Sequence, residues 1–473
     1  MKNLFKNFKK NKNDIALIDL DHSKYTYSDI IINNNYIISK VKKKSLVLLI
    51  GSNSADFIFG YTAFLQSEFT AILLDESFMP DYVESIIKRF KPKYIFSPKS
   101  FPLSQKNKFN KILISLRSYE LLETNYKKIY KLNKKNRLLL TTSGTTQNPK
   151  FVRLSAGNLK NNSDSIRNYL KINKNQTAIT TMPIAYSYGL SIINSHLDAG
   201  AKIVLNKSTL FEKIFWEKIN RFNVNSLNGV PQFYELLKKL KFHKFNIPSL
   251  KYITQAGGKL DESTIKYFYK IMNKKNLNFF IMYGQTEAAP RMSYLKLNNS
   301  SLSKINSIGK VLKGSKFELF NKKRQKIKSV NKPGEIVYYG KNVSLGYASK
   351  IADLTKGDMN NHILFTGDLA YKDKSDYYFI TGRKNRISKI FGLRVNLEDI
   401  EKKLMQNGIK ARCQINDKIL LISTSDIFKA IKIKDLIKKF YKINHNFIEI
   451  EEINKIILGS SFKNLSVKKK YKK

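Results

Sequence analysis

The sequence is poor in cysteine and proline. Its 473 residues include one cysteine, Cys413, and 10 prolines. A single cysteine excludes an internal disulfide and a cysteine-based zinc site, and it suits a reducing compartment such as the cytoplasm. Hydrophobic residues make up 42% of the chain, which together with the low proline content indicates a folded globular protein.

Long uninterrupted apolar runs are also absent. The apolar stretch 45–74 contains polar residues, among them Asp56 and Glu68, so it predicts a strand, a helix and a strand in a core. Residues 1–14 are basic and lack the apolar segment of a secretory signal. We therefore expect neither a membrane span nor a secretory signal.

Acidic residues are scarce, with 36 Asp and Glu against 86 Lys and Arg, and the formal net charge is +50. Such a charge could indicate nucleic acid, an anionic membrane or an acidic protein partner. Lysine is raised along the whole chain, however, and no helix-turn-helix, zinc or aromatic-ribbon signature accompanies it. A uniform compositional bias explains the charge better, and we expect no nucleic-acid partner.

Short apolar runs alternate with amphipathic stretches, which predicts an α/β protein with largely parallel sheets. Strands are expected at 45–51, 71–75, 137–142, 176–182, 226–229, 252–255 and 279–283, and helices at 55–65 and 81–90. From about Ile305 the pattern changes to a β-rich subdomain. We expect a large N-terminal domain over 1–384 and a small, mobile C-terminal α+β domain over 385–473.

The segment from Thr141 to Lys150 reads Thr-Thr-Ser-Gly-Thr-Thr-Gln-Asn-Pro-Lys. Hydroxyls and a glycine after a buried strand offer many hydrogen-bond donors in a small concavity, as triphosphate oxygens require. Lys150 adds a full positive charge. The loop lacks the Walker pattern, and alone it favours phosphate binding no more than a polar surface loop.

Further motifs follow in order along the chain. They are Gln255-Ala-Gly-Gly258, Tyr283-Gly-Gln-Thr-Glu287, Phe365-Thr-Gly-Asp368 and Gly382-Arg-Lys-Asn-Arg386. With the Thr141–Lys150 loop, this series resembles the adenylate-forming superfamily of acyl-CoA synthetases, peptide-synthetase adenylation domains and luciferases. The resemblance covers nearly the whole chain, although Gln147 and Phe151 replace two glycines of the family's loop.

The resemblance implies specific roles for individual residues. ATP phosphates would contact the loop residues Thr142, Ser143, Gly144, Thr145, Thr146 and Lys150. Tyr283 would stack on adenine, Thr286 would contact the α-phosphate, and Glu287 would hold Mg²⁺. Gly257 and Gly258 would let the ligand approach the backbone closely, and Asp368 and Arg383 would bind the ribose hydroxyls.

Two implied roles fall where the chain departs from the family pattern. The interdomain hinge would be Asn385, which stands in place of an aspartate. The catalytic lysine would be Lys463, in Ser-Ser-Phe-Lys, with Phe462 in place of a glycine. A positioned ammonium would stabilise the charge that builds up as a carboxylate attacks the α-phosphate, but a solvated lysine in a lysine-rich tail is the competing interpretation.

Met182-Pro-Ile-Ala-Tyr-Ser-Tyr-Gly189 resembles the family's segment beside the acyl pocket, with Tyr186 in place of histidine. The predicted pocket residues are Tyr186, Ser187, Tyr188, Gly189 and Val230. Adenylation domains for α-amino acids carry an aspartate in this region, and none occurs between Pro183 and Ser195. An uncharged acyl chain is therefore the favoured substrate.

The implied activity is ATP-dependent formation of an acyl-adenylate from a small carboxylic acid, with pyrophosphate release, followed by transfer to a thiol. The thiol could belong to coenzyme A, which family frequency favours, or to the phosphopantetheine arm of an acidic acyl carrier protein. Charge does not decide between them, because both acceptors are anionic. A nucleotide-binding protein of the same fold without turnover is the remaining alternative.

Overall fold

The computed structural model describes residues 4–466, apart from 43, 104–108, 129, 142–149, 385–386, 391–392, 417–418, 442, 453–455 and 459–463. At 109–110, 387–390, 393–396, 416, 456–458 and 464–466 it describes the backbone alone. The chain divides into two compact units, Met1–Phe317 with Tyr338–Leu364 and Glu318–Val337 with Phe365–Lys473. The predicted boundary after residue 384 lies inside the second unit and stays a prediction.

One of the two large sheets of the first unit has eight strands. In spatial order they are β20 (Tyr347–Ala348), β9 (Phe151–Leu154), β8 (Leu138–Thr141), β4 (Thr70–Asp75), β3 (Leu46–Gly51), β5 (Tyr94–Pro98), β7 (Tyr119–Thr124) and β6 (Phe109–Ser115). Strands β8, β4, β3 and β5 are parallel. The central strands β3 and β4 are buried along their whole length, as expected for parallel strands covered on both faces.

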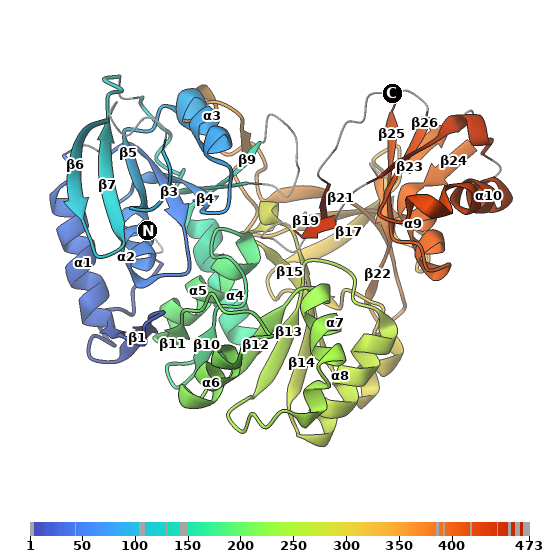
Figure 1. Ribbon diagram of the computed structural model, residues 1–473, viewed down its shortest axis with the longest axis horizontal. Helices are drawn as coiled ribbons and strands as arrows, with labels where there is room; N and C mark the ends of the chain where they lie inside the picture. Colours follow the sequence, from blue (N-terminus) through green and yellow to red (C-terminus); the bar gives the residue numbers. More distant parts are fainter. Residues whose placement is uncertain are drawn as a thin grey trace. The chain divides into compact units, whose positions relative to one another are not determined.

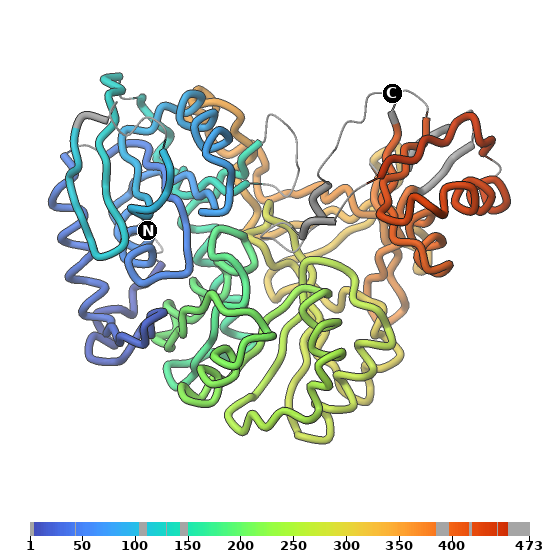
Figure 2. Tube along the Cα trace, viewed as in Figure 1, coloured from blue at the N-terminus to red at the C-terminus, as the bar shows by residue number. Residues whose placement is uncertain are grey.

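The second large sheet has nine strands. Their order is β16 (Lys310–Val311), β15 (Arg291–Leu297), β14 (Asn278–Gly284), β13 (Tyr252–Gln255), β12 (Ser226–Gly229), β10 (Thr177–Ile179), β11 (Lys202–Val204), β1 (Ile15–Ile18) and β2 (Lys24–Thr26). Strands β14, β13, β12, β10, β11 and β1 run parallel. The N-terminal strand β1 therefore lies beside β11, almost 190 residues later in the chain, as the trace in Figure 2 shows.

Helices fill the layer between the two sheets and cover their outer faces (Figure 1). Helices α2 (Ala55–Gln66) and α5 (Ser187–Ala199) are buried on almost every side and share one apolar core that includes residues of both sheets. Tyr61 of α2 donates a hydrogen bond to Asn194 of α5 at 2.9 Å. The remaining helices of this unit are α1 (Tyr27–Ser39), α3 (Pro80–Phe90), α4 (Ala156–Leu170), α6 (Lys213–Arg221), α7 (Pro231–Lys239) and α8 (Glu262–Lys274).

The two ends of helix α5 are defined by the residues that flank it. Tyr186 is its extended N-cap residue, and Gly200 ends it in the left-handed conformation at φ 77°. Glycine adopts this conformation without the steric cost that other residues incur. The last residues of the segment that resembles the family's acyl-pocket motif, Ser187 to Gly189, therefore form the first turn of α5.

The second unit contains most of a five-stranded sheet and a smaller α+β part. The sheet order is β18 (Lys326–Ile327), β17 (Lys316–Phe320), β19 (Gly334–Tyr339), β21 (Ile363–Lys372) and β22 (Tyr378–Arg383). The smaller part has helices α9 (Leu397–Gln406) and α10 (Ala430–Tyr441) and strands β23 (Ile387–Ile390), β24 (Leu393–Asn396), β25 (Ala411–Asn416), β26 (Ile419–Thr424), β27 (Ile448–Glu452), β28 (Ile456–Leu458) and β29 (Asn464–Ser466).

The smaller part has its own apolar core, in which Cys413 is buried with Ile400, Ile422 and Ile433. This environment agrees with a structural thiol. No helix in the described part of the chain is both long and apolar enough to cross a membrane.

Candidate functional site

Several predicted site residues of the first unit lie at one edge of the nine-stranded sheet. Strands β12, β13 and β14 are parallel neighbours, and each ends at a segment singled out from the sequence. Val230 follows β12, Gly257 follows β13, and Thr286 follows β14. In open α/β sheets, ligands bind beyond the carboxyl ends of parallel strands. This edge is therefore the candidate active site.

The turn after β14 holds three of the predicted nucleotide-binding residues. Tyr283 is the penultimate residue of β14, and Thr286 and Glu287 begin the 3-10 turn η3 (Thr286–Ala288). The Thr286 and Ser187 hydroxyl oxygens lie 3.2 Å apart. The structure thus brings the residue expected at the α-phosphate into contact with the first residue of α5, which is predicted to line the acyl pocket.

Glu287 is held by residues that lie far from it in the sequence. Its Oε1 accepts a hydrogen bond from the Tyr347 hydroxyl at 2.8 Å, and its carbonyl oxygen accepts one from the Ser344 amide at 2.8 Å. Burial, and secondarily the Glu287 charge, raise the pKa of Tyr347 well above its usual value. Tyr347 therefore stays a neutral donor that orients the carboxylate.

Two buried asparagines fix the chain just beyond Glu287. The side-chain amides of Asn162 and Asn342 both donate to the carbonyl oxygens of Ala288 and Arg291, at distances of 2.6–3.3 Å. Asn162 lies on α4 and Asn342 lies in the loop after β19. Four hydrogen bonds from rigid neighbours limit the movement of this turn, which favours a preorganised site.

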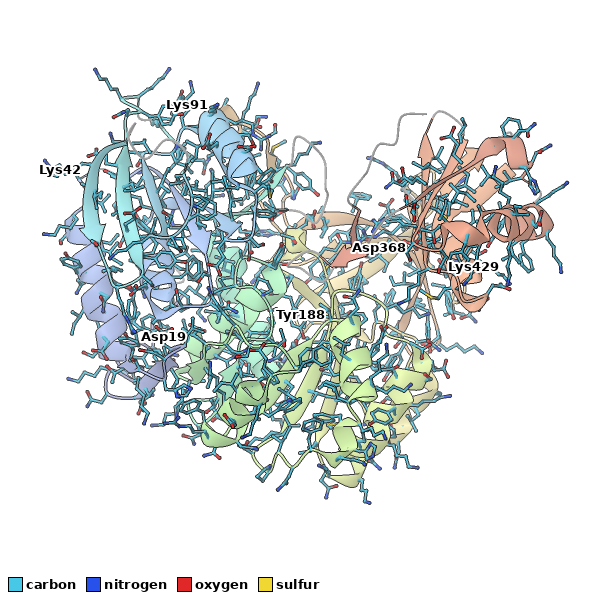
Figure 3. All side chains as sticks on the ribbon, viewed as in Figure 1. Asp19, Lys42, Lys91, Tyr188, Asp368 and Lys429 are labelled. Carbon is cyan, nitrogen blue, oxygen red and sulfur yellow. The ribbon has the colours of Figure 1, made fainter. Side chains whose placement is uncertain are left out.

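Tyr188, one of the predicted acyl-pocket residues, belongs to a buried polar network. The Tyr188 hydroxyl lies 2.7 Å from the Thr254 hydroxyl, which donates to Asn228 Oδ1 at 2.7 Å. Figure 3 shows Tyr188 in the interior of the first unit, where it is 9% exposed. Burial raises the pKa of Tyr188 well above its usual value, so its hydroxyl stays protonated. The hydroxyls of this network can therefore both accept and donate hydrogen bonds.

The glycines of the pocket allow close packing. A Cβ atom at Gly189 would lie 2.3 Å from the Pro183 carbonyl oxygen, so only glycine fits there. Gly257 has φ 86°, and a Cβ atom there would lie 3.1 Å from Val230 Cγ1. The bare backbone expected at Gly257 is thus required by the turn itself and by its contact with Val230.

The expected phosphate loop connects two antiparallel strands of the eight-stranded sheet. Strand β8 ends at Thr141 and pairs with β9, which begins at Phe151. Lys150 is exposed at the start of β9. The loop residues Thr142, Ser143, Gly144, Thr145 and Thr146 lie outside the described residues, so their contacts with nucleotide remain predictions.

In the second unit, the two predicted ribose-binding residues face each other. Asp368 on β21 pairs directly with Arg383 on β22, and Arg383 Nε donates to Asp368 Oδ1 at 2.5 Å. Asp368 is 3% exposed, and Figure 3 shows it in the sheet. Its amide donates to the Thr366 hydroxyl at 3.1 Å. A carboxylate held in this way is positioned to accept hydrogen bonds from sugar hydroxyls.

Glu335 supports the turn that carries Asp368. Its Oε1 accepts a hydrogen bond from the Gly367 amide at 3.2 Å, and its Oε2 forms an ion pair with Lys384 at 3.0 Å. Gly367 has φ 72°, a conformation that favours glycine. Glu335 therefore ties the Asp368 turn to the residue immediately before the predicted hinge.

The comparison with protein families identifies the chain. The model of the AMP-binding enzyme family matches residues 4–348, about three quarters of the sequence. The chain belongs to the AMP-binding enzyme family. This confirms the resemblance found in the sequence, and the protein is an AMP-forming ligase.

Characterised relatives of this AMP-binding enzyme include ligases with different acceptors. The oxalate–CoA ligase of Arabidopsis thaliana is 22% identical over 77% of this chain and 74% of its own length. A D-alanine–D-alanyl carrier protein ligase of Listeria monocytogenes is 24% identical over 86% of this chain and 80% of its own. Both are acid ligases, but their named acids and acceptors differ.

The fold also matches a solved structure of an adenylate-forming enzyme. The o-succinylbenzoate CoA synthetase of Bacillus subtilis, in complex with its acyl-adenylate intermediate, superimposes with a TM-score of 0.75 at 19% identity. The match covers 98% of this chain and 97% of that protein. The predicted α/β fold class is confirmed.

The remaining predicted residues of the AMP-binding enzyme are Asn385, Lys463, Tyr186 and Gly258. Asn385 and Lys463 lie outside the described residues, and so their roles as hinge and catalytic lysine stay predictions. Tyr186 is half-buried at the start of α5, next to Ser187. Gly258 closes the turn after β13, where its carbonyl oxygen accepts a hydrogen bond from the Gln255 side chain at 2.8 Å.

Several residues that hold the predicted site residues in place were not predicted from the sequence, namely Asn162, Arg291, Glu335, Asn342 and Tyr347. All lie outside the family motifs, and they reach the site only through tertiary contacts. One feature of the sequence could have indicated Arg291. It is a charged residue at the start of a largely apolar run, Arg-Met-Ser-Tyr-Leu, shortly after the Glu287 motif.

Proposed function

We propose that this AMP-binding enzyme activates a small carboxylic acid with ATP and transfers the acyl group to a thiol, preferentially that of coenzyme A. The contact between Thr286 and Ser187 carries the proposal. It joins the residue expected at the α-phosphate to a residue expected beside the acid, which is the geometry that attack of the acid on the nucleotide requires.

The reaction proposed at this edge has two steps. A carboxylate oxygen attacks the α-phosphorus of ATP, the bond to the bridging oxygen breaks, and pyrophosphate leaves. The thiol sulfur, once deprotonated, then attacks the acyl carbon, and AMP leaves as the thioester forms. Thr286 would hydrogen-bond the α-phosphate, Asp368 and Arg383 would hold the ribose, and Lys150 and Lys463 would offset negative charge on the phosphates.

Glu287 would hold Mg²⁺ in this scheme. Carboxylate oxygen is a ligand that Mg²⁺ prefers, and a nucleotide-bound Mg²⁺ needs only one or two protein carboxylates besides phosphates and water. The described residues contain no cluster of three or more potential metal ligands, which agrees with a site completed by the nucleotide. The bound metal would neutralise phosphate charge.

The test is acid-dependent exchange of labelled pyrophosphate into ATP, measured over short, long, aromatic, dicarboxylic and amino acids. At least one acid should support exchange in the wild type. Glu287→Gln should lower the exchange rate by about 10²-fold or more, because it weakens the expected metal ligand. The control is Glu217→Gln, which changes an exposed carboxylate on α6 and should leave the rate unchanged.

If the enzyme binds ATP but none of the acids in the panel supports pyrophosphate exchange, the proposal is contradicted and the alternative without turnover is favoured. The acceptor is tested separately. Coenzyme A and a phosphopantetheinylated carrier protein are offered to the enzyme with the preferred acid, and thioester formation is followed by mass spectrometry. The relative from Listeria monocytogenes, named for a carrier protein, is the reason to include the second acceptor.

A further inference from the structure

Arg291 is a buried cation beside the predicted acyl pocket. It begins strand β15 directly after the Glu287 turn and is 1% exposed. No salt bridge to it is found among the described residues, and its Nε and Nη2 atoms have no hydrogen-bond partner there. Burying an ionised side chain costs free energy unless an opposite charge or hydrogen bonds offset the loss of water. A bound anion would offset this cost at Arg291.

The two unpartnered nitrogens share one edge of the guanidinium group. Nε–H and the adjacent Nη2–H point the same way and form the fork that binds a carboxylate through two parallel hydrogen bonds. Fully buried Arg153 differs in this respect, because its Nη1 and Nη2 donate to the carbonyl oxygens of Leu345, Lys356 and Gly357. Arg153 thus holds a loop, whereas Arg291 keeps its binding edge available.

The surroundings of Arg291 place its guanidinium group beside Tyr188, a predicted residue of the acyl pocket. Its guanidinium lies over the Tyr188 ring, 5.0 Å from the ring centre, and Tyr188 is itself fixed by the Thr254 hydroxyl. On another side lies Tyr169, stacked on Tyr294 with ring centres 4.1 Å apart. Burial raises the pKa of Tyr169 to about 12, and the charge of Arg291 and a side-chain hydrogen bond from Arg291 oppose this rise. Tyr169 is therefore a neutral neighbour and does not supply the missing anion.

Arg291 is also close to the site of the proposed reaction along the chain. It pairs across the sheet with Gly284, between Tyr283 and the Thr286 turn, and Asn162 and Asn342 hold its carbonyl oxygen. Tyr188, under its guanidinium, follows Ser187, which contacts Thr286. A molecule with one carboxylate beside Thr286 and a second group beyond Tyr188 would meet Arg291 with that second group.

We propose that the acid activated by this enzyme carries a second carboxylate, which Arg291 binds through Nε and Nη2 at the far end of the acyl pocket. The inference rests on the proposed function. It also replaces the uncharged acyl chain favoured by the sequence, because an apolar chain would leave the buried guanidinium unpaired. Arg291 is then a specificity-determining residue that binds the unreactive end of the substrate.

The test compares acids matched in length, with and without the second carboxylate. Butanoate is paired with succinate, pentanoate with glutarate, hexanoate with adipate and benzoate with phthalate, and kcat/KM for pyrophosphate exchange is measured for each. For at least one pair, the wild type should prefer the dicarboxylate by about 10²-fold. Arg291→Met should lower kcat/KM for that dicarboxylate by about 10²–10³-fold and leave the matched monocarboxylate within about tenfold.

Two further variants separate recognition from stability. Arg291→Lys keeps the charge without the fork and should retain part of the preference. Arg153→Met removes an equally buried arginine that makes no contact with Tyr188, and it should lower stability without changing the ratio of the two rates. A ratio measured on one preparation does not depend on how much of the protein is folded.

The inference is overturned if, for every pair, the wild type has the same kcat/KM for the monocarboxylate and the dicarboxylate. It is also overturned if Arg291→Met lowers kcat/KM for both acids by the same factor. In either case pyrophosphate exchange still occurs and the proposed function stands. If no acid supports pyrophosphate exchange, both the proposed function and this inference are contradicted.

Discussion

His196 is a histidine whose environment favours its neutral form. It is 2% exposed on α5, and its Nδ1 lies 2.8 Å from the Ile192 carbonyl oxygen. Burial lowers its pKa to about 4, although the hydrogen bond to Ile192 opposes the shift. A histidine in the unfolded chain has a pKa near 6.5. The unfolded state therefore binds more protons than the folded state between about pH 4 and pH 6.5.

This difference makes His196 a source of acid sensitivity. Stability that depends on neutral His196 is complete above about pH 6.5 and falls as the pH drops toward 4, by about 2 kcal/mol between pH 7 and pH 5. We expect His196→Asn to lose less stability over that interval than the wild type. Thermal midpoints of both proteins at pH 7 and pH 5 check this, and equal losses would show that His196 does not contribute.

The residue scale also shows which predictions the sequence could support. Tyr283, Thr286 and Glu287 are contiguous in the chain, and a short motif was enough to find them. Arg291 is only four residues further on, yet its importance depends on burial, and arginine is a residue type that is mostly exposed. Asn342, in the loop after β19, and Tyr347, in strand β20, approach the same turn from a distant part of the chain, and no local pattern reveals such contacts.

At the scale of elements, the pattern of apolar residues predicted the parallel strands well. Strands β12 and β13 have the predicted bounds, and β14 differs by one residue at each end. The strand expected at 176–182 instead spans only Thr177–Ile179. The Thr180 amide still donates to the Val204 carbonyl oxygen of β11 at 3.0 Å, while the Thr180 hydroxyl accepts from the Asn206 amide and the Thr181 hydroxyl donates to the Asn228 carbonyl oxygen. The remaining residues form the turn into α5.

The junction between this turn and α5 gives an element-scale prediction. Gly189→Ala would place a methyl group 2.3 Å from the Pro183 carbonyl oxygen, so α5 or the turn must shift, at a cost of about 1–3 kcal/mol. We expect a lower thermal midpoint and a raised KM for the acid, because Ser187 and Tyr188 lie on the displaced first turn. Steady-state kinetics with varied acid measures the second effect.

Gly157→Ala is the matched control for that substitution. Gly157 lies in the first turn of α4, and its nearest neighbour to an added Cβ is the Ser155 hydroxyl at 3.5 Å. Alanine has the higher helix propensity, so this variant should be as stable as the wild type or slightly more stable. An unchanged KM in Gly189→Ala would contradict the role given to the first turn of α5.

At the scale of the whole molecule, the proposed reaction uses residues from both units. Tyr283, Thr286 and Glu287 belong to the first unit, whereas Asp368, Arg383 and Lys463 belong to the second. The α/β class could be predicted from alternating patterns, and the family motifs gave the order of the site residues. The sequence could not predict that most of β17 and β19 belongs to the second unit, because this depends on contacts between separate segments of the chain.

Lys463, the predicted catalytic lysine, belongs to the second unit. Lys463→Ala should slow adenylate formation by about 10²–10³-fold, since it removes one positioned donor to the developing phosphate charge. Thioester formation from added acyl-adenylate should be affected much less. Lys468→Ala, in the same lysine-rich terminal segment, is the control. Equal rates of adenylate formation in the wild type and Lys463→Ala would leave the lysine with no catalytic role.

The division of the chain into units has a consequence for how the protein could be cut or recombined. The second unit takes residues 318–337 from the middle of the first and then the whole stretch from Phe365 onward, so the backbone passes between the units three times. Strands β17 and β18 would stay behind in any single-cut deletion that removed β21 and β22. If only the continuous C-terminal segment of the second unit were exchanged between relatives, the resulting protein would combine sheet strands from two different sequences. A working chimera therefore needs both segments of the second unit from the same relative.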